Sequence, residues 1–250
     1  MFPQLYHAHH NRYLEDVPFW LELADQHGDP VLELGCGTGR VLLPLARAGH
    51  RVIGLDNDLS MLHFLRSHLE ATLQPAPEVF VADLAAFRLA VRFPLITLPC
   101  NTFSTLPAET RRVALQCVRL HLQPGGLFAT SVPNPRLLLD LPARSEAQVE
   151  DEFTNPLTGN PVQVSSAWRR TKKHFVVTWY YDHLFPDGTI QRQTAEVRHE
   201  LAPAQVYLDD IRAAGLDIEA VYGDFDHSAY DPQSPYLLII ARAKSINIPE

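Results

Sequence analysis

The chain has 250 residues, of which 46% are hydrophobic and 20% are charged, and its formal net charge is −8 at pH 7. These values are typical of a globular protein with one large domain or two small ones. The negative charge and the lack of a long Lys or Arg run argue against a nucleic-acid-binding surface. No apolar stretch reaches 18 residues, so we expect no transmembrane helix and no membrane partner.

Cysteine content and the first residues bear on the cellular compartment. Cys36, Cys100 and Cys117 are odd in number and unevenly spaced, which favours reduced thiols over disulfides or a zinc site. Residues 1–7 lack the basic and apolar regions of a signal peptide. We therefore expect a cytoplasmic protein.

Strand and helix signals alternate along the first half of the chain. An amphipathic helix is expected over 16–26, ended by Gly28-Asp29-Pro30. Repeated βα units follow, which predict a mostly parallel sheet with helices on both faces. The expected strands are 31–34, 51–55, 79–82, 94–98 and 127–132. Between them we expect three helices, one from Thr38, one near Ser60 and one over 107–122, and a glycine turn at 123–126.

The pattern changes after residue 134. Strand-like runs cover 162–169, 175–184 and 189–200, and Pro186-Asp187-Gly188 predicts a hairpin between the last two. The α/β pattern then returns, with a helix over 203–214 and strands over 217–222 and 237–243. We therefore predict an α/β fold with a seven-stranded, mostly parallel sheet from residues 1–134 and 202–250. An antiparallel β-sheet lid is expected at 135–201, where it could also serve a homodimer.

The stretch 31–40 joins the first strand to a helix through a glycine turn, VLELGCGTGR. Backbone amides at such a junction bind ligands, because bare glycine backbone lets a ligand approach closely. A dinucleotide-binding loop would need glycine at residue 40 or 42, where Arg40 and Leu42 stand. The G-K-S/T ending of a phosphate loop is also missing.

An aspartate follows each of the next two expected strands. Asp56 ends the second strand about twenty residues after the first glycine, a spacing at which a carboxylate binds a ribose diol. Asp83 ends the third strand at the same edge of the sheet. Because the carboxyl ends of parallel strands line one crevice, we expect Gly37, Asp56 and Asp83 to converge on a nucleoside.

The glycine turn and these aspartates resemble the class I S-adenosylmethionine (SAM) dependent methyltransferases, whose first motif is E/D-x-G-x-G-x-G. The resemblance covers nearly the whole chain: 122–126 resembles the loop that commonly precedes the fifth strand, and the inserted sheet resembles the amino-sugar N-methyltransferase branch. It implies a Rossmann-like fold and SAM as the cofactor. It also implies methyl transfer to an amine or hydroxyl of a small-molecule acceptor by in-line displacement.

The resemblance assigns site residues one by one. It implies that SAM is bound by Glu33, Gly35, Cys36, Gly37, Asp56, Asn57, Met61, Asp83, Leu84 and Pro99. It implies catalytic roles beside the reactive methyl for Tyr6, His10, Asn101 and Phe103. The tyrosine over the cofactor could be Tyr6 or Tyr13, and the Tyr-Asp pair usual in this branch is absent because His7 follows Tyr6.

Other interpretations stay open. Pro99-Cys100 also resembles the nucleophile motif of cytosine C5-methyltransferases, although the Glu-Asn-Val motif of those enzymes is missing. His7, His9 and His10 have no acidic or cysteine partner at a known metal-binding spacing, so we expect no metal. A SAM-binding regulator or assembly subunit without turnover is a further alternative, and an NAD-type reductase is another.

Overall fold

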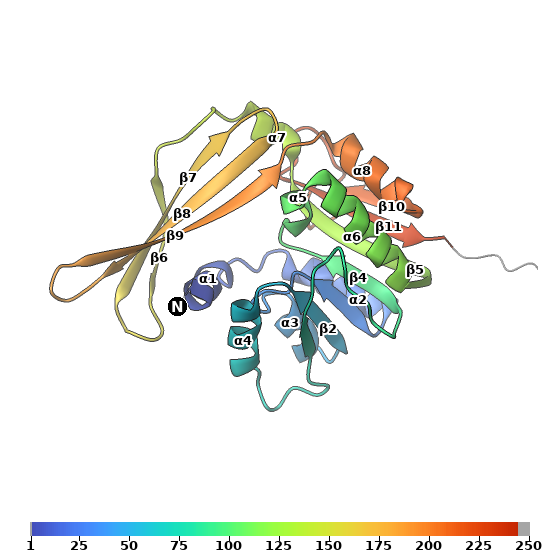
Figure 1. Ribbon diagram of the computed structural model, residues 1–250, viewed down its shortest axis with the longest axis horizontal. Helices are drawn as coiled ribbons and strands as arrows, with labels where there is room; N and C mark the ends of the chain where they lie inside the picture. The colour runs from blue at the N-terminus through green and yellow to red at the C-terminus, as the bar shows by residue number, and fades with distance from the viewer. Residues whose placement is uncertain (1, 245–250) are drawn as a thin grey trace, which may run out of the picture.

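The structure is a computed structural model that describes residues 2–244, and it contains two separate β-sheets (Figure 1). The helices are α1 (Phe2–His10), α2 (Val17–His27), α3 (Leu42–Arg47), α4 (Leu59–Ser67), α5 (Thr102–Thr105), α6 (Ala108–His121), α7 (Pro135–Asp140) and α8 (Ala204–Ala213). The strands are β1 (Val31–Leu34), β2 (Val52–Asp56), β3 (Glu78–Val81), β4 (Phe93–Leu98), β5 (Leu122–Pro133), β6 (Gln148–Thr154), β7 (Pro161–Arg170), β8 (His174–Leu184), β9 (Ile190–Glu200), β10 (Leu216–Tyr222) and β11 (Tyr236–Ala243).

The larger sheet has seven strands in the order β10-β11-β5-β4-β1-β2-β3. β1 pairs in parallel with β2 and β4, and the pairs β2–β3 and β4–β5 are also parallel. β11 runs antiparallel to both β5 and β10. The predicted seven-stranded, mostly parallel sheet is therefore confirmed, and the carboxyl ends of β1 to β4 meet at one edge.

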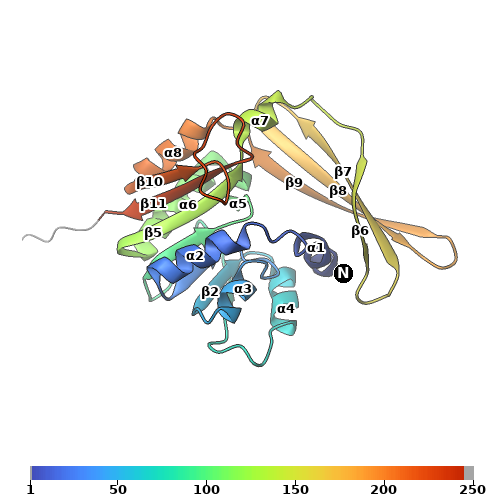
Figure 2. The same cartoon turned by 180° about the vertical axis from the view of Figure 1, so that it is seen from behind.

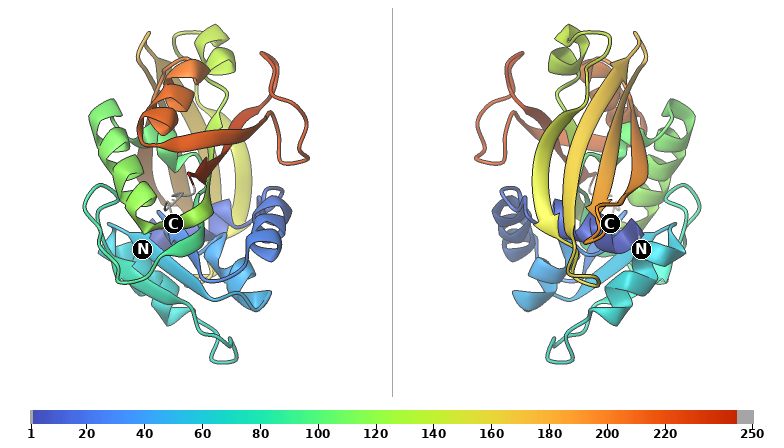
Figure 3. Two further views of the ribbon diagram at one scale, coloured as in Figure 1. Left: turned by 90° about the vertical axis from the view of Figure 1, so that its right-hand side faces the viewer. Right: turned by 90° about the vertical axis from the view of Figure 1, so that its left-hand side faces the viewer.

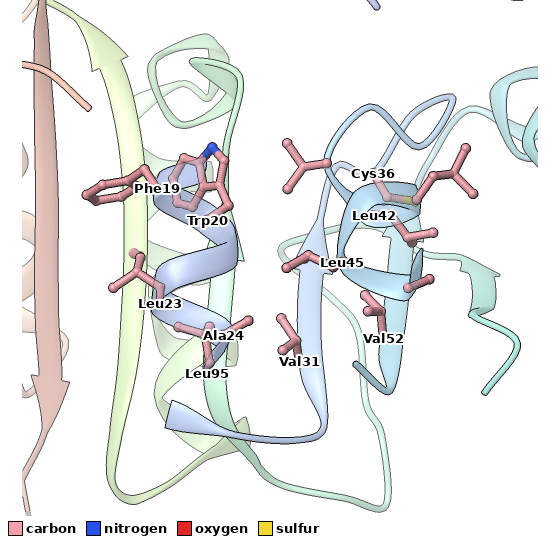
Figure 4. Close-up of a cluster of buried hydrophobic side chains, with 14 of the residues drawn as sticks. Phe19, Trp20, Leu23, Ala24, Val31, Cys36, Leu42, Leu45, Val52 and Leu95 are labelled. Atoms are coloured by element: carbon pink, nitrogen blue, oxygen red, sulfur yellow. The ribbon is translucent and has the colours of Figure 1, made fainter. Parts of the chain in front are cut away.

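Both faces of β1 are covered, since all four of its residues are buried. On one face, Phe19 and Trp20 of α2 share a hydrophobic cluster with Leu45 of α3 and Val31 of β1 (Figure 4). On the other face, apolar side chains of α6 and α8 form a second cluster with β4 and β5. Burial on both faces explains why these strands are continuous apolar runs rather than alternating patterns.

The smaller sheet has the order β6-β7-β8-β9, and each neighbouring pair is antiparallel (Figure 3). This confirms the predicted antiparallel insertion. One face of β8 turns toward α1, where Tyr181 shares a buried cluster with Leu5. Because neighbouring residues of a strand point to opposite faces, Asp182 lies on the outer face, where it binds Arg192. A homodimer through this sheet stays a prediction.

Helix α1 lies between the two parts of the molecule. It contacts α4 on one side and β6 on the other (Figures 1 and 2). Toward α4, the His7 ring lies 4.9 Å from the ring of Phe64. Toward the smaller sheet, Leu5 is fully buried and His9 Nδ1 lies 3.1 Å from the Tyr181 hydroxyl. Helix α1 therefore contacts both the α/β part of the molecule and the smaller sheet.

Some local predictions are wrong. The helix predicted from Thr38 begins at Leu42, because Gly39 has a φ of 88° that a right-handed helix does not accept. The glycine turn predicted at 123–126 lies within β5, where the pairing with β4 shifts register. Strand β6 and the short helix α7 were not predicted. β6 is mostly polar and exposed, so it lacks the apolar alternation that marks a strand.

Residues 135–201 contain α7 and all four antiparallel strands. The division into two domains at these boundaries stays a prediction. In the part of the chain that the structure describes, no helix has the length and apolar character needed to cross a membrane.

Candidate functional site

The loop after β1 presents bare backbone at the carboxyl edge of the large sheet. Gly37 has a φ of 52°, and a Cβ at this position would lie 4.0 Å from the Asp56 carboxylate. A Cβ on Gly39, whose φ is 88°, would lie only 2.6 Å from Leu65 of α4. Gly37 thus leaves space in front of Asp56, and Gly39 lets α4 pack closely behind the loop.

Asp56, the last residue of β2, faces this loop. Its Oδ2 accepts a hydrogen bond from the Gly37 N–H, and its Oδ1 accepts one from the Asp58 N–H, both at 2.8 Å. Burial raises the pKa of Asp56, and the backbone hydrogen bonds partly oppose that rise. Asp58, and not Asp56, caps α4. Because a carboxylate offers about four lone-pair sites, Asp56 can still accept bonds from ligand hydroxyls.

Glu33 lies in β1 just before the glycine loop and is only 1% exposed. Its Oε2 has no hydrogen-bond partner within residues 2–244. Desolvation raises its pKa to about 8, and Arg40 opposes this in part. The carboxyl is therefore largely protonated at neutral pH and can donate a hydrogen bond as well as accept one. An unpartnered buried polar atom next to a glycine loop favours a polar ligand there.

A cavity of about 920 Å³ lies between α1, the chain that follows β4, and the smaller sheet. Its size is within the range of pockets that hold a cofactor or a drug-sized ligand. Much of the wall is aromatic, from Tyr6, Tyr13, Phe175, Trp179, Phe225 and Tyr236. The charged side chains in the lining are four carboxylates and one guanidinium, namely Glu15, Asp16, Asp224, Asp226 and Arg40.

Helix α1 brings the predicted residues Tyr6 and His10 to this cavity. Desolvation raises the pKa of Tyr6, with smaller contributions from Cys100 and Asp56. His10 Nε2 has no partner among the described residues, and burial lowers the pKa of its ring to about 3, so the imidazole is neutral. Tyr13 is 48% exposed. The geometry therefore favours Tyr6 over Tyr13 as the tyrosine above the cofactor.

Arg40 links the glycine loop to the chain before α2 and to the chain after β4. Its guanidinium donates two hydrogen bonds of 2.6 Å to Asp16 and one of 2.9 Å to Cys100 Sγ. Asp16 also accepts from the indole N–H of Trp20 at 2.9 Å. Burial raises the pKa of Cys100 to about 11. It is therefore a thiol, not the thiolate that nucleophilic attack on a cytosine requires.

The chain after β4 is strained where it meets the cavity. Cys100 and Asn101 have φ angles of 60° and 61°, a region that residues other than glycine rarely adopt. Asn101 lines the cavity, and its Oδ1 has no hydrogen-bond partner in the described chain. Strain of this kind costs about 1–3 kcal/mol per residue and clusters at ligand sites.

Comparisons with known proteins agree with this geometry. Residues 31–126 match the family described as a methyltransferase domain. Residues 31–126 are a methyltransferase domain. The chain is also 33% identical over 109 residues to the cypemycin N-terminal methyltransferase of Streptomyces sp., a match that spans 43% of this chain and 43% of that protein.

Solved structures of methyltransferases share the fold over almost the whole chain. The CcbJ methyltransferase from Streptomyces caelestis has a TM-score of 0.75 and 23% identity, covering 92% of this chain and 90% of that one. The sugar N-methyltransferase KedS8 from Streptoalloteichus sp. has a TM-score of 0.76 and 18% identity, covering 98% and 93%. At these identities the likeness shows a common fold that includes the inserted sheet.

The methyltransferase domain brings most predicted cofactor residues to one edge of its sheet. Gly37 and Asp56 are in direct contact, and Glu33 lies in the strand before them. The open backbone at Gly37, the acceptor oxygens of Asp56 and the unpartnered Oε2 of Glu33 fit SAM. They would hold the cofactor together with Gly35 and the backbone of Cys36, whose side chain is buried in the core. These contacts stay predictions.

The predicted cofactor residues that follow β2 and β3 are more exposed than Glu33. Asn57 is exposed, and Met61 and Leu84 are partly buried, which leaves them accessible to a nucleoside. Asp83 is exposed, and its Oδ1 accepts a hydrogen bond from the Ala85 N–H at 2.8 Å. Asp83 thus stabilises its own turn, and a contact with adenine stays a prediction.

Two residues with predicted roles, Phe103 and Pro99, do not line the cavity. The Phe103 ring is fully buried, 5.8 Å from the ring of Tyr207, so it belongs to the core and not to the cavity wall. Pro99 is also buried, and its carbonyl accepts a hydrogen bond from the Thr102 N–H at 3.3 Å, so its contact with the cofactor stays a prediction.

Sequence reasoning missed Arg40, Ser104 and His199. Arg40 and His199 line the cavity, and Ser104 contacts His199. Arg40 follows the glycine loop directly, so its position was a usable signal. His199 lies 95 residues from Ser104, and no motif connects the two.

Proposed function

We propose that this protein is a SAM-dependent methyltransferase that acts on an amine or hydroxyl of a small molecule by in-line displacement. The observation that carries the proposal is the position of the aromatic cavity. It is lined by Cys100 and Asn101 after β4 and by Arg40, which directly follows the glycine loop. A small molecule in the cavity would therefore lie beside a cofactor bound at the glycine loop.

The chemistry divides between cofactor and protein. SAM, when bound, supplies a methyl group on a positively charged sulfur. The protein has to hold the acceptor atom in line with that methyl and exclude water, and positioning alone contributes about 7–11 kcal/mol. Tyr6, Phe175 and Trp179 line the cavity and offer π faces to positive charge.

The charge of the cavity favours binding of an amine that is protonated in solution and that must release this proton to water before its nitrogen lone pair can attack. Arg40 is already paired with Asp16, whereas Glu15, Asp224 and Asp226 have no ion-pair partner in the part of the chain that the structure describes. Carboxylates at a cavity wall attract cations and repel phosphate or carboxylate groups. We therefore propose an N-acceptor without a phosphate group.

A screen of acceptors tests this proposal. The purified protein is incubated with SAM and matched sets of amines, alcohols and phosphorylated amines, and S-adenosylhomocysteine release is measured. We expect release with one or more unphosphorylated amines. Binding of SAM without release for any acceptor class would instead support a non-catalytic SAM-binding protein. Release only with phosphorylated acceptors would contradict the role given to the acidic wall.

A further inference from the structure

A hydrogen bond between Ser104 and His199 joins the chain after β4 to the inserted sheet, and His199 lines the cavity. Ser104 lies on α5, just after the strained residues Cys100 and Asn101, and it is 2% exposed. His199 lies on β9 and is 8% exposed. Ser104 Oγ and His199 Nδ1 are 2.8 Å apart, so the bond crosses from one sheet to the other.

The hydrogen-bond network fixes the tautomer of His199. Ser104 Oγ also lies 2.8 Å from the carbonyl oxygen of Asn101, which can only accept. The hydroxyl has one hydrogen, and that hydrogen is used by this carbonyl. Toward His199 the hydroxyl can therefore only accept, so His199 Nδ1 carries the proton and donates it. In the neutral ring, Nε2 then keeps its lone pair.

The remaining lone pair is available to a ligand. His199 lines the cavity, its Nδ1 edge is occupied by Ser104, and no hydrogen bond within residues 2–244 occupies Nε2. Burial lowers the pKa of the ring to about 4, which keeps it neutral near pH 7. Phe175 pairs with His199 across the sheet and also lines the cavity. Nε2 of His199 is therefore a polar acceptor beside Phe175 in the cavity wall.

We propose that His199 positions the methyl acceptor, with Nε2 accepting a hydrogen bond from its N–H or O–H. A hydrogen directed at Nε2 leaves the lone pair of the acceptor atom pointing away from the ring and free for attack. Ser104 acts as the positioning residue for His199. The inference rests on the proposed methyltransferase function.

His10 does not meet the same condition. It lines the cavity and its Nε2 lacks a partner, but within the described chain its ring makes ring contacts with Tyr6, His9 and Trp179 and no hydrogen bond. No hydrogen bond therefore fixes its tautomer. A side chain that positions the methyl acceptor must itself be fixed in place by its neighbours. The hydrogen bond with Ser104 fixes His199 in this way, which favours His199 over His10.

Substitutions of His199 separate acceptor positioning from a purely structural role. His199→Leu removes the acceptor atom, whereas His199→Gln can keep an oxygen near the position of Nε2. We expect His199→Leu to lower kcat/KM about 100-fold, because a misplaced reactant reacts about that much more slowly. His199→Gln should have a kcat/KM at least about tenfold higher than that of His199→Leu. The Kd for SAM, measured by isothermal titration, should stay within about threefold in both. Equal activity of His199→Leu and the wild type would overturn the inference.

Ser104 has a matched control on the same short helix. Thr105 Oγ1 donates to the Thr102 carbonyl at 2.8 Å, as Ser104 Oγ does to Asn101, but it has no contact with His199 among the hydrogen bonds of the described residues. We expect Ser104→Ala to lower kcat/KM about tenfold and Thr105→Val to leave it within twofold. Equal losses in both variants would show a structural effect of the hydroxyls and would overturn the role of Ser104.

Nitrogen-15 NMR of the histidine rings in the ligand-free protein provides a readout without turnover, and His199→Gln assigns the signal. We expect the Nδ1–H tautomer for His199 at pH 7, with loss of that preference in Ser104→Ala. A wild-type Nε2–H tautomer would overturn the inference, even if SAM binds and methyl transfer occurs. If the wild type binds no SAM and transfers no methyl group, the proposed function fails, and the inference fails with it whatever the tautomer.

Discussion

The N–H of Gly37 donates a 2.8 Å hydrogen bond to Oδ2 of Asp56, which ties the loop after β1 to the end of β2. The bond places a partly buried carboxylate in front of bare glycine backbone. A second backbone bond, from the Asp58 N–H to Oδ1, fixes the orientation of the carboxylate. Asp56 is thus held in place before any ligand binds, which lowers the entropic cost of binding a ribose.

Asp56→Asn is expected to weaken SAM binding at least tenfold. Hydrogen bonds to a charged group contribute about 1.5–3 kcal/mol, and the amide also loses one of the acceptor oxygens that bind hydroxyls. Isothermal titration measures the Kd. Asp58→Asn is the matched control, since asparagine also caps helices well and the side chain of Asp58 bonds to the start of α4. Similar losses in both variants would contradict the role of Asp56.

Arg40→Met is expected to destabilise the fold by about 3–5 kcal/mol, because it leaves the buried Asp16 carboxylate without its counter-charge. The two side chains are only 15% and 9% exposed. Urea unfolding measures the free energy. Arg47→Met is the control: the pair between Arg47 and Glu70 is 52% and 46% exposed, so its loss should cost less than about 1 kcal/mol. Equal effects would show that the Asp16 pair is not buried in solution.

Glu33 is expected to make the fold less stable as pH rises. Its pKa is about 8 in the folded protein and 4.5 as the ordinary value, so between these pH values the folded state holds a proton that the unfolded state releases. The free energy of unfolding then falls by up to about 1.4 kcal/mol per pH unit from this group. Glu33→Gln removes this dependence. Urea unfolding at pH 5 and pH 8 should therefore show a smaller decrease for the variant, and parallel decreases would contradict the assignment.

Tyr6→Phe tests the placement of α1 over the site. Loss of the hydroxyl should lower kcat/KM about tenfold, equal to about 1.4 kcal/mol of barrier, with the Kd for SAM within about threefold. Tyr13→Phe is the matched control because Tyr13 is 48% exposed. A larger effect for Tyr13 would assign the tyrosine above the cofactor to that residue instead.

The parallel sheet could be predicted because its strands are buried on both faces and therefore stand out as apolar runs. The cofactor could also be predicted, because the spacing of the glycines and the number of residues between the first glycine and Asp56 are visible in the sequence. Strand β6 could not be predicted, because its residues are mostly polar. It forms a strand through its antiparallel pairing with β7, which the local sequence does not record. Helix α7 is only six residues long, too short for a clear helical period.

The acceptor side of the site depends on contacts that no local pattern records. Phe103 and Asn101 lie two residues apart, yet the turn into α5 places one in the core and the other in the cavity. The contact between Ser104 and His199 depends on how the inserted sheet folds back on the end of β4. Such placements are set by tertiary packing, so sequence alone predicted the cofactor better than the acceptor site.

Isothermal titration of the wild-type protein with SAM, S-adenosylhomocysteine and NAD tests the central claim most directly. The open backbone at Gly37, the fixed carboxylate of Asp56 and the unpartnered Glu33 predict saturable one-to-one binding of the first two ligands. Arg40 and Leu42, where a dinucleotide loop needs glycine, predict no binding of NAD. Binding of NAD without binding of SAM or S-adenosylhomocysteine, or no binding of any of the three, would contradict the account.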